Sequence, residues 1–222
     1  MIRPRKIDKA PLERGTKRTA APREDAGVRE RIVAAARIEF AERGLGAASV
    51  HTIAERSGVT AAMINYYFGG KDALYEGIVA EAQEKLRTRL LSAAEGEANG
   101  MAVRLAGAYF DFLAQDRALQ RLLLREVIDR GDALRKVVSK HIDSLRALFV
   151  QWFGDEHERR QRAVTLFGAV AGYFIYEPLL GPFIDAEPLS TQALATRREH
   201  VLRLAQALEE MPCSNSSRTR SK

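Results

Sequence analysis

The side chains with the clearest chemical use lie in one short segment, residues 49–68, with the sequence SVHTIAERSGVTAAMINYYF. Its second half holds Asn65, Tyr66 and Tyr67, whose amide and hydroxyl groups can bond to base edges and to phosphates. Lys71 follows at the predicted start of the next helix, where a cation and free backbone N–H groups can hold a phosphate together. These residue types are those of a surface that binds nucleic acid.

The spacing of small and apolar residues in this segment predicts the pair of helices that such a surface needs. Ala54 is followed four residues later by Gly58, so two short helices can cross closely and the chain can turn between them. Ile53, Val59 and Ile64 would hold both helices against a preceding amphipathic helix. The second helix of such a helix-turn-helix enters the major groove of B-DNA. The spacing alone also fits an ordinary corner between two helices, and the polar residues favour DNA binding.

The rest of the chain is expected to be helical as well, because apolar residues recur at helical spacing and strand-like alternation is missing from the sequence. In the first helix, Ile32, Ala36 and Phe40 fall on one face. About nine helices are predicted, over residues 28–43, 50–57, 61–68, 72–94, 101–115, 119–130, 133–153, 156–176 and 189–210. The predicted fold class is all-α, with a three-helix helix-turn-helix domain ahead of a helical bundle.

Positive charge is concentrated at the two ends of the chain, whose net charge is +6. Residues 1–23 hold eight basic and two acidic side chains, and residues 213–222 hold three basic ones, so the remainder is mildly acidic. Prolines, charges and few apolar residues predict a disordered basic arm over residues 1–25 and a disordered tail over 212–222. Arms of this kind bind an acidic polymer such as DNA, or serve only as solvated tails, and the charge fits both.

The sequence gives no support to a catalytic, metal-binding or membrane protein. Gly70-Lys71 is followed by Asp72, so the phosphate loop of nucleotide hydrolases is not formed, and the common dinucleotide-binding and serine-hydrolase motifs are missing. The single Cys213 excludes a cysteine-pair metal site, and the acidic residues around His157 fit a helix start better than a metal site. Neither an apolar run of transmembrane length nor a signal peptide is found. We therefore expect no enzyme activity, no cofactor, no metal and a cytoplasmic location.

Residues 28–75 resemble the DNA-binding domain of the TetR family of bacterial transcriptional repressors. The resemblance is carried by the stretches RERIVAAARIEFAERG, SVHTIAERSGV and TAAMINYYFGGKDALY. The C-terminal part matches the family only in length, helical content and helix order. The resemblance implies a DNA-binding domain over residues 26–86, an effector-binding and dimerisation domain over 87–211, and a homodimer.

The resemblance also implies roles for individual residues. The expected DNA-contacting set is Ser49, His51, Thr60, Ala61, Ala62, Met63, Asn65, Tyr66, Tyr67 and Lys71. Ser49 would cap its helix and bond a phosphate, and Tyr67 and Lys71 would face the DNA backbone. Asn65 stands where tyrosine is usual in the family, and Ser57 where alanine is usual. An asparagine can pair with an adenine edge, although Asn65 and His51 are also compatible with plain surface positions.

Polar side chains within the apolar-faced helices of the C-terminal part are typical of a ligand cavity in a bundle. The candidate pocket residues are Tyr109, Arg121, Arg125, His141, Trp152 and Tyr173. Each of them can instead cap a helix or extend along the surface into solvent. The sequence therefore predicts a cavity for a small-molecule effector without fixing its contacts.

Small residues four apart on the predicted helix 156–176 permit another helix to approach closely. Together with an apolar face of the last helix they suggest a four-helix interface between two copies of the chain. The candidate interface residues are Val164, Gly168, Ala171, Gly172, Ile175, Leu194, Val201, Leu204 and Leu208. The same face can also pack within one chain, and the family resemblance favours the dimer.

Together these features predict a homodimeric DNA-binding transcriptional regulator. In this interpretation it represses from a palindromic operator in double-stranded DNA and is released by a small-molecule effector, which changes the distance between the two recognition helices. The main alternative is a dimer that coats DNA or bridges proteins without regulating transcription. An enzyme is a second alternative, for which the sequence offers no residue set.

Overall fold

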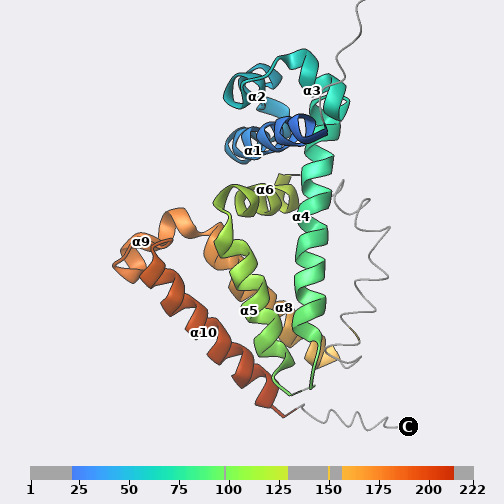
Figure 1. Cartoon of the computed structure of the whole chain (residues 1–222). Coiled ribbons are helices and arrows are strands. Elements are labelled where there is room, and N and C mark those ends of the chain that lie inside the picture. The colour runs from blue at the N-terminus through green and yellow to red at the C-terminus, as the bar shows by residue number, and fades with distance from the viewer. Residues whose placement is uncertain (1–21, 98, 130–149, 151–156, 213–222) are drawn as a thin grey trace, which may run out of the picture.

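The computed structural model describes residues 22–97, 99–129, 150 and 157–212. Within these ranges the fold is all-α, as predicted, and consists of nine helices and their connections (Figure 1). Their bounds are α1 Pro22–Ala47, α2 Val50–Ser57, α3 Ala61–Phe68, α4 Lys71–Ala94, α5 Met101–Gln115, α6 Arg117–Asp129, α8 His157–Ile175, α9 Glu177–Ile184 and α10 Thr191–Glu210. The helix predicted over residues 133–153 lies outside the described residues, apart from residue 150.

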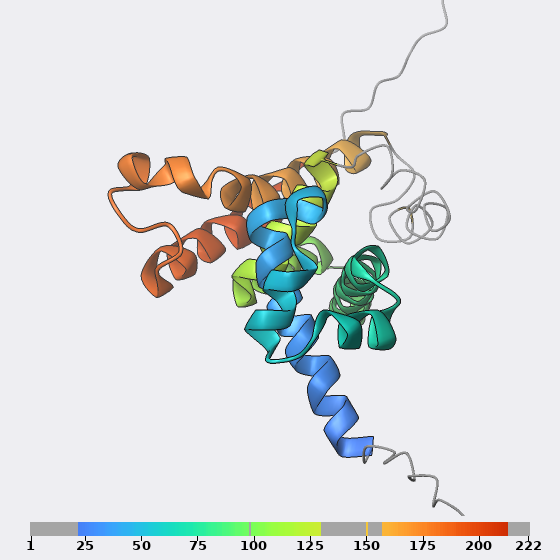
Figure 2. The same ribbon diagram turned by 90° about the horizontal axis from the view of Figure 1, so that it is seen from above.

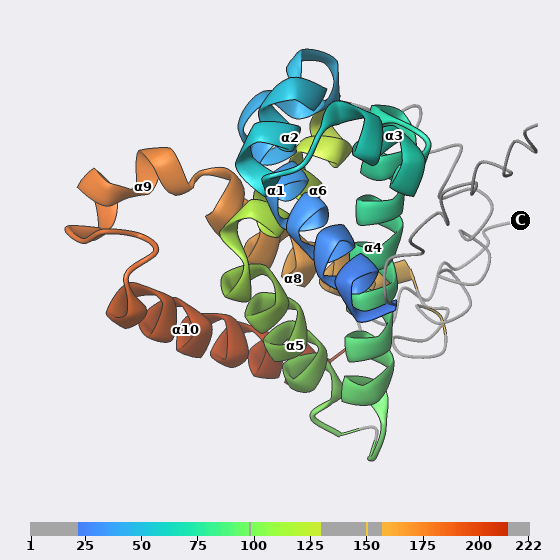
Figure 3. The same cartoon turned by 45° about the horizontal axis from the view of Figure 1, so that its top comes forward.

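The first three helices and the start of α4 form one layer around a shared apolar core (Figures 1 and 3). Ile32 and Phe40 of α1, Ile53 of α2 and Ile64 of α3 are all completely or almost completely buried there. The ring of Tyr75 in α4 meets Phe40 edge-on, with 5.0 Å between ring centroids. The predicted apolar face of the first helix is therefore the side on which the other three helices are assembled.

Helices α5, α8 and α10 pack with the remaining length of α4 into a second layer with its own core. Phe110 and Leu113 of α5, Val170 of α8, and Val201 and Ala205 of α10 are buried in this core. The 24-residue helix α4 runs through both layers and joins them (Figure 1). Viewed from above, α9 and the start of α10 project to one side, away from α4 (Figure 2).

Helix α6 connects the two layers because it packs under α1. Leu122 of α6 is buried in the same core as Ile32 and Phe40. The Arg125 guanidinium of α6 donates hydrogen bonds to the carbonyl oxygens of Ala41 and Glu42, at 3.4 and 3.2 Å. These carbonyls lie in the last regular turn of α1, where backbone oxygens lack helical partners. Arg125 therefore caps α1 from the neighbouring layer.

Gly44 makes this contact possible. Its φ of 70° and ψ of 170° interrupt α1, so the regular helix stops at the glycine, as predicted, and the chain then makes a further turn to Ala47. A Cβ at this position would lie 3.1 Å from Arg125 Nε, which is tighter than nine in ten Cβ contacts, so the guanidinium would have to shift by a few tenths of an ångström. The positive φ favours glycine here, and the close guanidinium adds to that preference.

The structure departs from the prediction at the N-terminal end of the described chain. Helix α1 begins at Pro22, so residues 22–25, expected to belong to a disordered arm, are helical. Proline is favoured in the first helical turn, where its missing N–H costs nothing, and acidic residues such as Asp25 are stabilised near that end. Asp25 is also held in place by a hydrogen bond from Tyr67 of α3, which local sequence signals do not reveal.

Helix α9 was missed by the prediction, because Pro178, Gly181 and Pro182 were taken only as a helix stop. The structure places Pro178 in the first turn of α9, where no N–H is needed, and tolerates Pro182 in a helix of only two turns. Asp185 then ends α9 with a φ of 49°. The remaining predicted bounds agree with the structure to within two residues.

Among the described helices, no single one is long and apolar enough to cross a membrane. Helices α8 and α9 reach the necessary length and hydropathy only as a pair, and the two meet at 90°.

We expect the substitution Phe40→Ala to lower the free energy of unfolding by about 3–5 kcal/mol, because it leaves a cavity between α1 and α4. Ile38→Ala is the matched control on the same helix, since Ile38 is 44% exposed, and should cost less than about 1 kcal/mol. Urea denaturation of the full chain measures both. Equal losses in the two variants would contradict the assignment of this core.

Candidate nucleic-acid interface

The turn between α2 and α3 is built by the residues that the sequence singled out. Gly58 ends α2 in the left-handed conformation, with φ 68° and ψ 34°, which glycine adopts without a steric penalty. Its N–H bonds to the Glu55 carbonyl at 3.2 Å, and the N–H of Val59 bonds to the Ala54 carbonyl at 3.0 Å. Ala54 is buried at the crossing of the helices. The predicted helix-turn-helix is therefore confirmed as a local structure.

Each of the two short helices begins with the predicted cap. The Ser49 hydroxyl accepts a hydrogen bond from the Thr52 N–H at 3.4 Å, and the Thr60 hydroxyl accepts one from the Met63 N–H at 3.3 Å. Ser57, where the family usually has alanine, is buried and donates its hydroxyl proton to the Ile53 carbonyl at 2.6 Å. This bond satisfies the extra hydroxyl, so the departure at Ser57 is accommodated within α2.

A buried carboxylate positions α2, and the sequence reading missed it. Glu39 of α1 is fully buried, and its Oε1 accepts a hydrogen bond from the backbone N–H of Ser49 at 3.1 Å. Arg43 and Arg56 approach the carboxylate at 3.4 and 4.0 Å and supply compensating charge. The sequence did indicate that Glu39 is buried, because position 39 lies seven residues after Ile32 and therefore falls on the apolar face of α1.

One face of α3 is left open to solvent. Ala61, Ala62, Asn65 and Tyr66 are exposed, Tyr66 by 83%, whereas Ile64 on the opposite face is completely buried. The face combines small residues, which let a helix approach a groove closely, with an amide and a phenol that can bond there. Figure 3 shows α3 at the outer edge of its layer, beside the start of α4.

The other predicted contacts surround this face. His51 is exposed in the first turn of α2, and Thr60 is exposed at the start of α3, while Met63 is half-buried. The side-chain oxygen of Asn65 lies 3.6 Å from the position that a Cβ on Gly70 would occupy, so this amide rests over the turn into α4. The structure thus brings His51, Thr60, Met63 and Asn65 to one end of the molecule.

Tyr67 has a different role from the predicted one. Its hydroxyl donates a 2.6 Å hydrogen bond to Asp25 Oδ1, and this bond raises the pKa of the Tyr67 hydroxyl. Arg29 bonds to the Tyr67 carbonyl at 3.0 Å and lies over the Phe68 ring. Because the only proton of the hydroxyl is already donated, and the accepting carboxylate repels phosphate, Tyr67 ties α3 to α1 instead of facing a phosphate.

Lys71 makes hydrogen bonds within the protein and keeps one ammonium proton for another partner. Its Nζ donates to the carbonyl oxygens of Gly46 and Ala48 at 3.5 and 3.1 Å, which fixes the connection between α1 and α2. An ammonium group has three protons, so one remains for an anion. Lys71 is also the first residue of α4, whose N-cap Gly70 provides no side-chain cap. The first N–H groups of a helix lack helical partners, so they and a lysine ammonium are both groups that can bind a phosphate.

Three of the predicted pocket residues make other contacts within the described part of the chain. Arg121 pairs with Glu177 at 3.5 Å, and Arg125 caps α1 as described. Tyr109 packs against the Phe167 ring with 5.3 Å between centroids, and burial raises the pKa of its hydroxyl. Tyr173 lines a pocket between α8, α9 and α10. His141 and Trp152 lie outside the described residues.

The predicted interface residues divide into two groups. On α8, Val164 is 60% exposed, Gly168 and Ile175 are also exposed, and Ala171 and Gly172 are half-buried. On α10, Val201 is completely buried in the core of its own chain, so including it was wrong. Three more α10 residues, half-buried, pack against that same core: Leu194, Leu204 and Leu208. The periodicity of α10 indicated burial, which the chain satisfies internally against α5.

An exposed apolar surface that the sequence reading missed continues from α8 onto α9. Phe183 is 84% exposed, and Tyr176 and Leu179 are exposed as well. These residues escaped notice because α9 was not expected to be a helix. We use the name α8–α9 face for Val164, Ile175, Tyr176, Leu179 and Phe183.

The part of the chain that forms the helix-turn-helix is similar in sequence to a known family of proteins. Residues 32–78, which run from α1 into α4, match the sequence profile of bacterial regulatory proteins of the tetR family. A relative from Bacillus subtilis (strain 168), the probable HTH-type transcriptional regulator YttP, is 30% identical over 142 residues, which cover 62% of this chain and 68% of that protein.

Solved structures share the fold well beyond the helix-turn-helix. A TetR-like transcriptional regulator from Rhodococcus sp. RHA1 superposes with a TM-score of 0.63 at 18% identity, over 83% of this chain and 97% of that one. A putative transcriptional regulator from Streptomyces coelicolor superposes with a TM-score of 0.56 at 24% identity, over 82% and 97% of the two chains. With its capped helix-turn-helix, its matching profile and its Bacillus subtilis relative, the chain belongs to the tetR family and is a DNA-binding transcriptional regulator.

Proposed function

We propose that the protein is a homodimeric repressor, that its two α3 helices bind successive major grooves of a palindromic operator, and that a small-molecule effector releases it. The observation that carries the proposal is the exposed face of α3, which is bounded by the phosphate-competent start of α4. The proposed contacts are Ser49, His51, Thr60, Ala61, Ala62, Met63, Asn65, Tyr66 and Lys71, and Tyr67 acts by positioning α3.

We assign DNA binding to residues 26–86, extended at the N-terminal side to Pro22, and effector binding and dimerisation to residues 87–211. The extension follows from the helical start of α1 and from the hydrogen bond between Tyr67 and Asp25. The separate apolar cores of the two layers support the division.

The α8–α9 face supports dimerisation. Val164, Gly168, Ala171 and Ile175 recur on one side of α8, and Leu179 and Phe183 recur on one side of α9. The glycine and alanine would let the same helix of a second copy approach closely, and the flanking side chains would lose exposed apolar area. A two-fold axis through this face brings identical residues together, which is the usual geometry of a homodimer.

Helix α6 offers a route from the effector domain to the DNA-binding domain. It is joined to α5 by a single residue, Asp116, and Leu122 and Arg125 bind it to α1. A shift of α6 would therefore move α1, which carries the core of the DNA-binding domain. Recognition helices of a dimer must lie about 34–36 Å apart to meet successive major grooves, so a small rotation of each domain lowers affinity.

Selection of bound sequences from random DNA, followed by mass measurement of the complex, tests the proposal. We expect a two-fold symmetric consensus bound by two copies of the chain, because a symmetric pair of α3 helices must read both strands alike. An asymmetric site that one copy binds with full affinity would contradict the dimeric reader.

Two substitutions should separate base reading from phosphate binding. Asn65→Ala should change the preferred base at one position per half-site, because Asn65 is exposed on α3 and an asparagine amide can pair with an adenine edge. Lys71→Met should weaken binding to all DNA sequences alike. It should also lower the slope of log K against log salt by about 2 for the dimer, since each phosphate contact contributes about 0.9. The matched control is Lys85→Met on the same helix, about 21 Å further along, which should leave the slope unchanged. Binding-site selection and salt titrations on the three variants measure these effects. An unaltered base preference in Asn65→Ala would refute its reading role.

Deletion of residues 1–21, which spares α1, should lower DNA affinity and its dependence on salt without altering the core of the palindrome. The deleted segment contains seven of the eight cations that lie ahead of residue 24. If two or three of them contact phosphates in each subunit, the slope of log K against log salt falls by roughly 4 to 5. Titrations of the full and shortened chains at several salt concentrations measure this slope. Equal slopes would mean that the segment does not contact DNA.

A further inference from the structure

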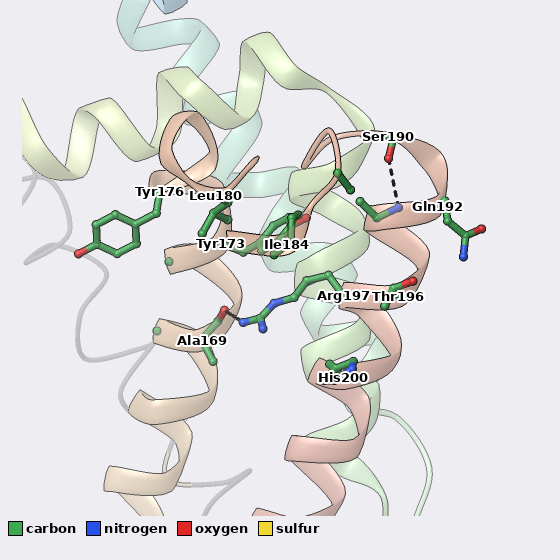
Figure 4. Close-up of a pocket in the computed structure, with 14 residues that line it drawn as sticks. Ala169, Tyr173, Tyr176, Leu180, Ile184, Ser190, Gln192, Thr196, Arg197 and His200 are labelled. Atoms are coloured by element: carbon green, nitrogen blue, oxygen red, sulfur yellow. Dashed lines mark hydrogen bonds between the residues drawn. The ribbon is translucent and has the colours of Figure 1, made fainter. Parts of the chain in front are cut away.

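A pocket of about 550 Å³ lies between α8, α9 and α10 (Figure 4). Its volume falls within the range of roughly 300–1,000 Å³ that is usual for small-molecule sites. Of the residues expected from the sequence to line an effector cavity, Tyr173 is among the described residues that line this pocket.

The pocket exists because α10 follows α5 more closely than α8. Helix α10 makes most of its contacts with α5 and fewer with α8. On the α8 side the wall is made of Gly168, Ala169 and Gly172, whose missing or short side chains leave the space unfilled. Leu180 and Ile184 of α9 contribute apolar side chains to one end (Figure 4).

Arg197 dominates the electrostatics of this pocket. Among the described residues that line the pocket, it is the one lysine or arginine, and none is an aspartate or a glutamate. Its Nη2 donates to the Ala169 carbonyl across the pocket at 2.8 Å, whereas its buried Nε has no hydrogen-bond partner among the described residues. A buried donor without a partner is costly, so an acceptor that reaches the guanidinium gains more than a surface contact would.

Among the described residues, the carboxylate nearest to this pocket wall is paired with other arginines, and the Tyr173 ring gives Arg197 only a cation–π contact. Glu177, the carboxylate close to Tyr173, is engaged by Arg117 at 3.1 Å and by Arg121 at 3.5 Å. The Tyr173 hydroxyl donates to the Pro188 carbonyl at 2.7 Å, while its ring lies 5.3 Å from the Arg197 guanidinium. Thr196 and His200 lie beside Arg197 on α10 and offer further hydrogen-bonding groups to the pocket (Figure 4).

We infer that this pocket binds an organic anion in which a carboxylate is joined to an apolar body. The carboxylate would pair with Arg197, within reach of Thr196 or His200, and the apolar body would lie on Tyr173, Leu180 and Ile184. The inference rests on the proposed function, because it identifies this anion as the effector that releases DNA. A ligand held between α8 and α10 would act next to the α8–α9 face, where it can change how two copies meet.

The test is calorimetric titration of the full-length protein with two carboxylate probes, 2-naphthoate and decanoate. We expect at least one of them to bind, and the uncharged 2-naphthamide or decanol of the same shape to bind at least about tenfold more weakly. Arg197→Gln should weaken the carboxylate by at least about tenfold and leave the neutral analogue unchanged. Arg203→Gln is the matched control, since Arg203 is an exposed arginine on the same helix, and should change neither. Thermal unfolding of each variant confirms that it is folded.

The inference is overturned if neither carboxylate binds, or if binding is equal in the wild type and in Arg197→Gln. It is likewise overturned if no probe binds and Arg197→Gln weakens self-association, because the pocket then belongs to the dimer interface. Adding the bound probe to the protein on its selected operator separates the two proposals. Arg197-dependent binding with release of DNA supports both, whereas the same binding without release supports the anion site and contradicts effector control through it.

Discussion

The packing of α1 between the reading helices and α6 is the constraint on which the rest of the structure depends. One face of α1 supplies Ile32 and Phe40 to the core that holds α2, α3 and α4, and its buried Glu39 fixes the start of α2. Leu122 of α6 enters the same core, and Arg125 caps the last regular turn of α1. The orientation of α3 is therefore tied to α6, and in the proposed mechanism this packing would connect effector binding to the orientation of α3.

The parts of the structure that follow from local chemistry were predictable from the sequence. Ser49 and Thr60 cap their helices because a hydroxyl at that position accepts an otherwise unpaired N–H, and Gly58 turns the chain because it accepts a positive φ. The apolar residues of α1 recur at helical spacing, and this periodicity identified the buried face of the helix. These signals involve residues within one helical turn, so a single sequence carries them, and the all-α fold and the helix-turn-helix follow from their sum.

The remaining features depend on residues that are distant in the sequence. Tyr67 is matched to Asp25 forty-two positions earlier, and Glu39 meets the backbone of Ser49, so neither partner can be read from its own neighbourhood. On α10, Val201 was predicted to face a partner chain but is buried in the core of its own chain, whereas Leu194, Leu204 and Leu208 are only half-buried. The pocket at Arg197 likewise depends on how α8, α9 and α10 are arranged relative to one another. The apolar periodicity within each helix does not predict that arrangement.

The claim that α3 is the helix that reads DNA is tested most directly by photocrosslinking from a single position. Tyr66 is 83% exposed on α3, and p-azidophenylalanine of similar size can replace it with little disturbance. The same replacement at Tyr176, an exposed tyrosine on the α8–α9 face, is the matched control. The account predicts that illumination of each complex with its selected operator links DNA to position 66 and leaves position 176 unlinked. Crosslinks to DNA from position 176, or none from position 66, would contradict it.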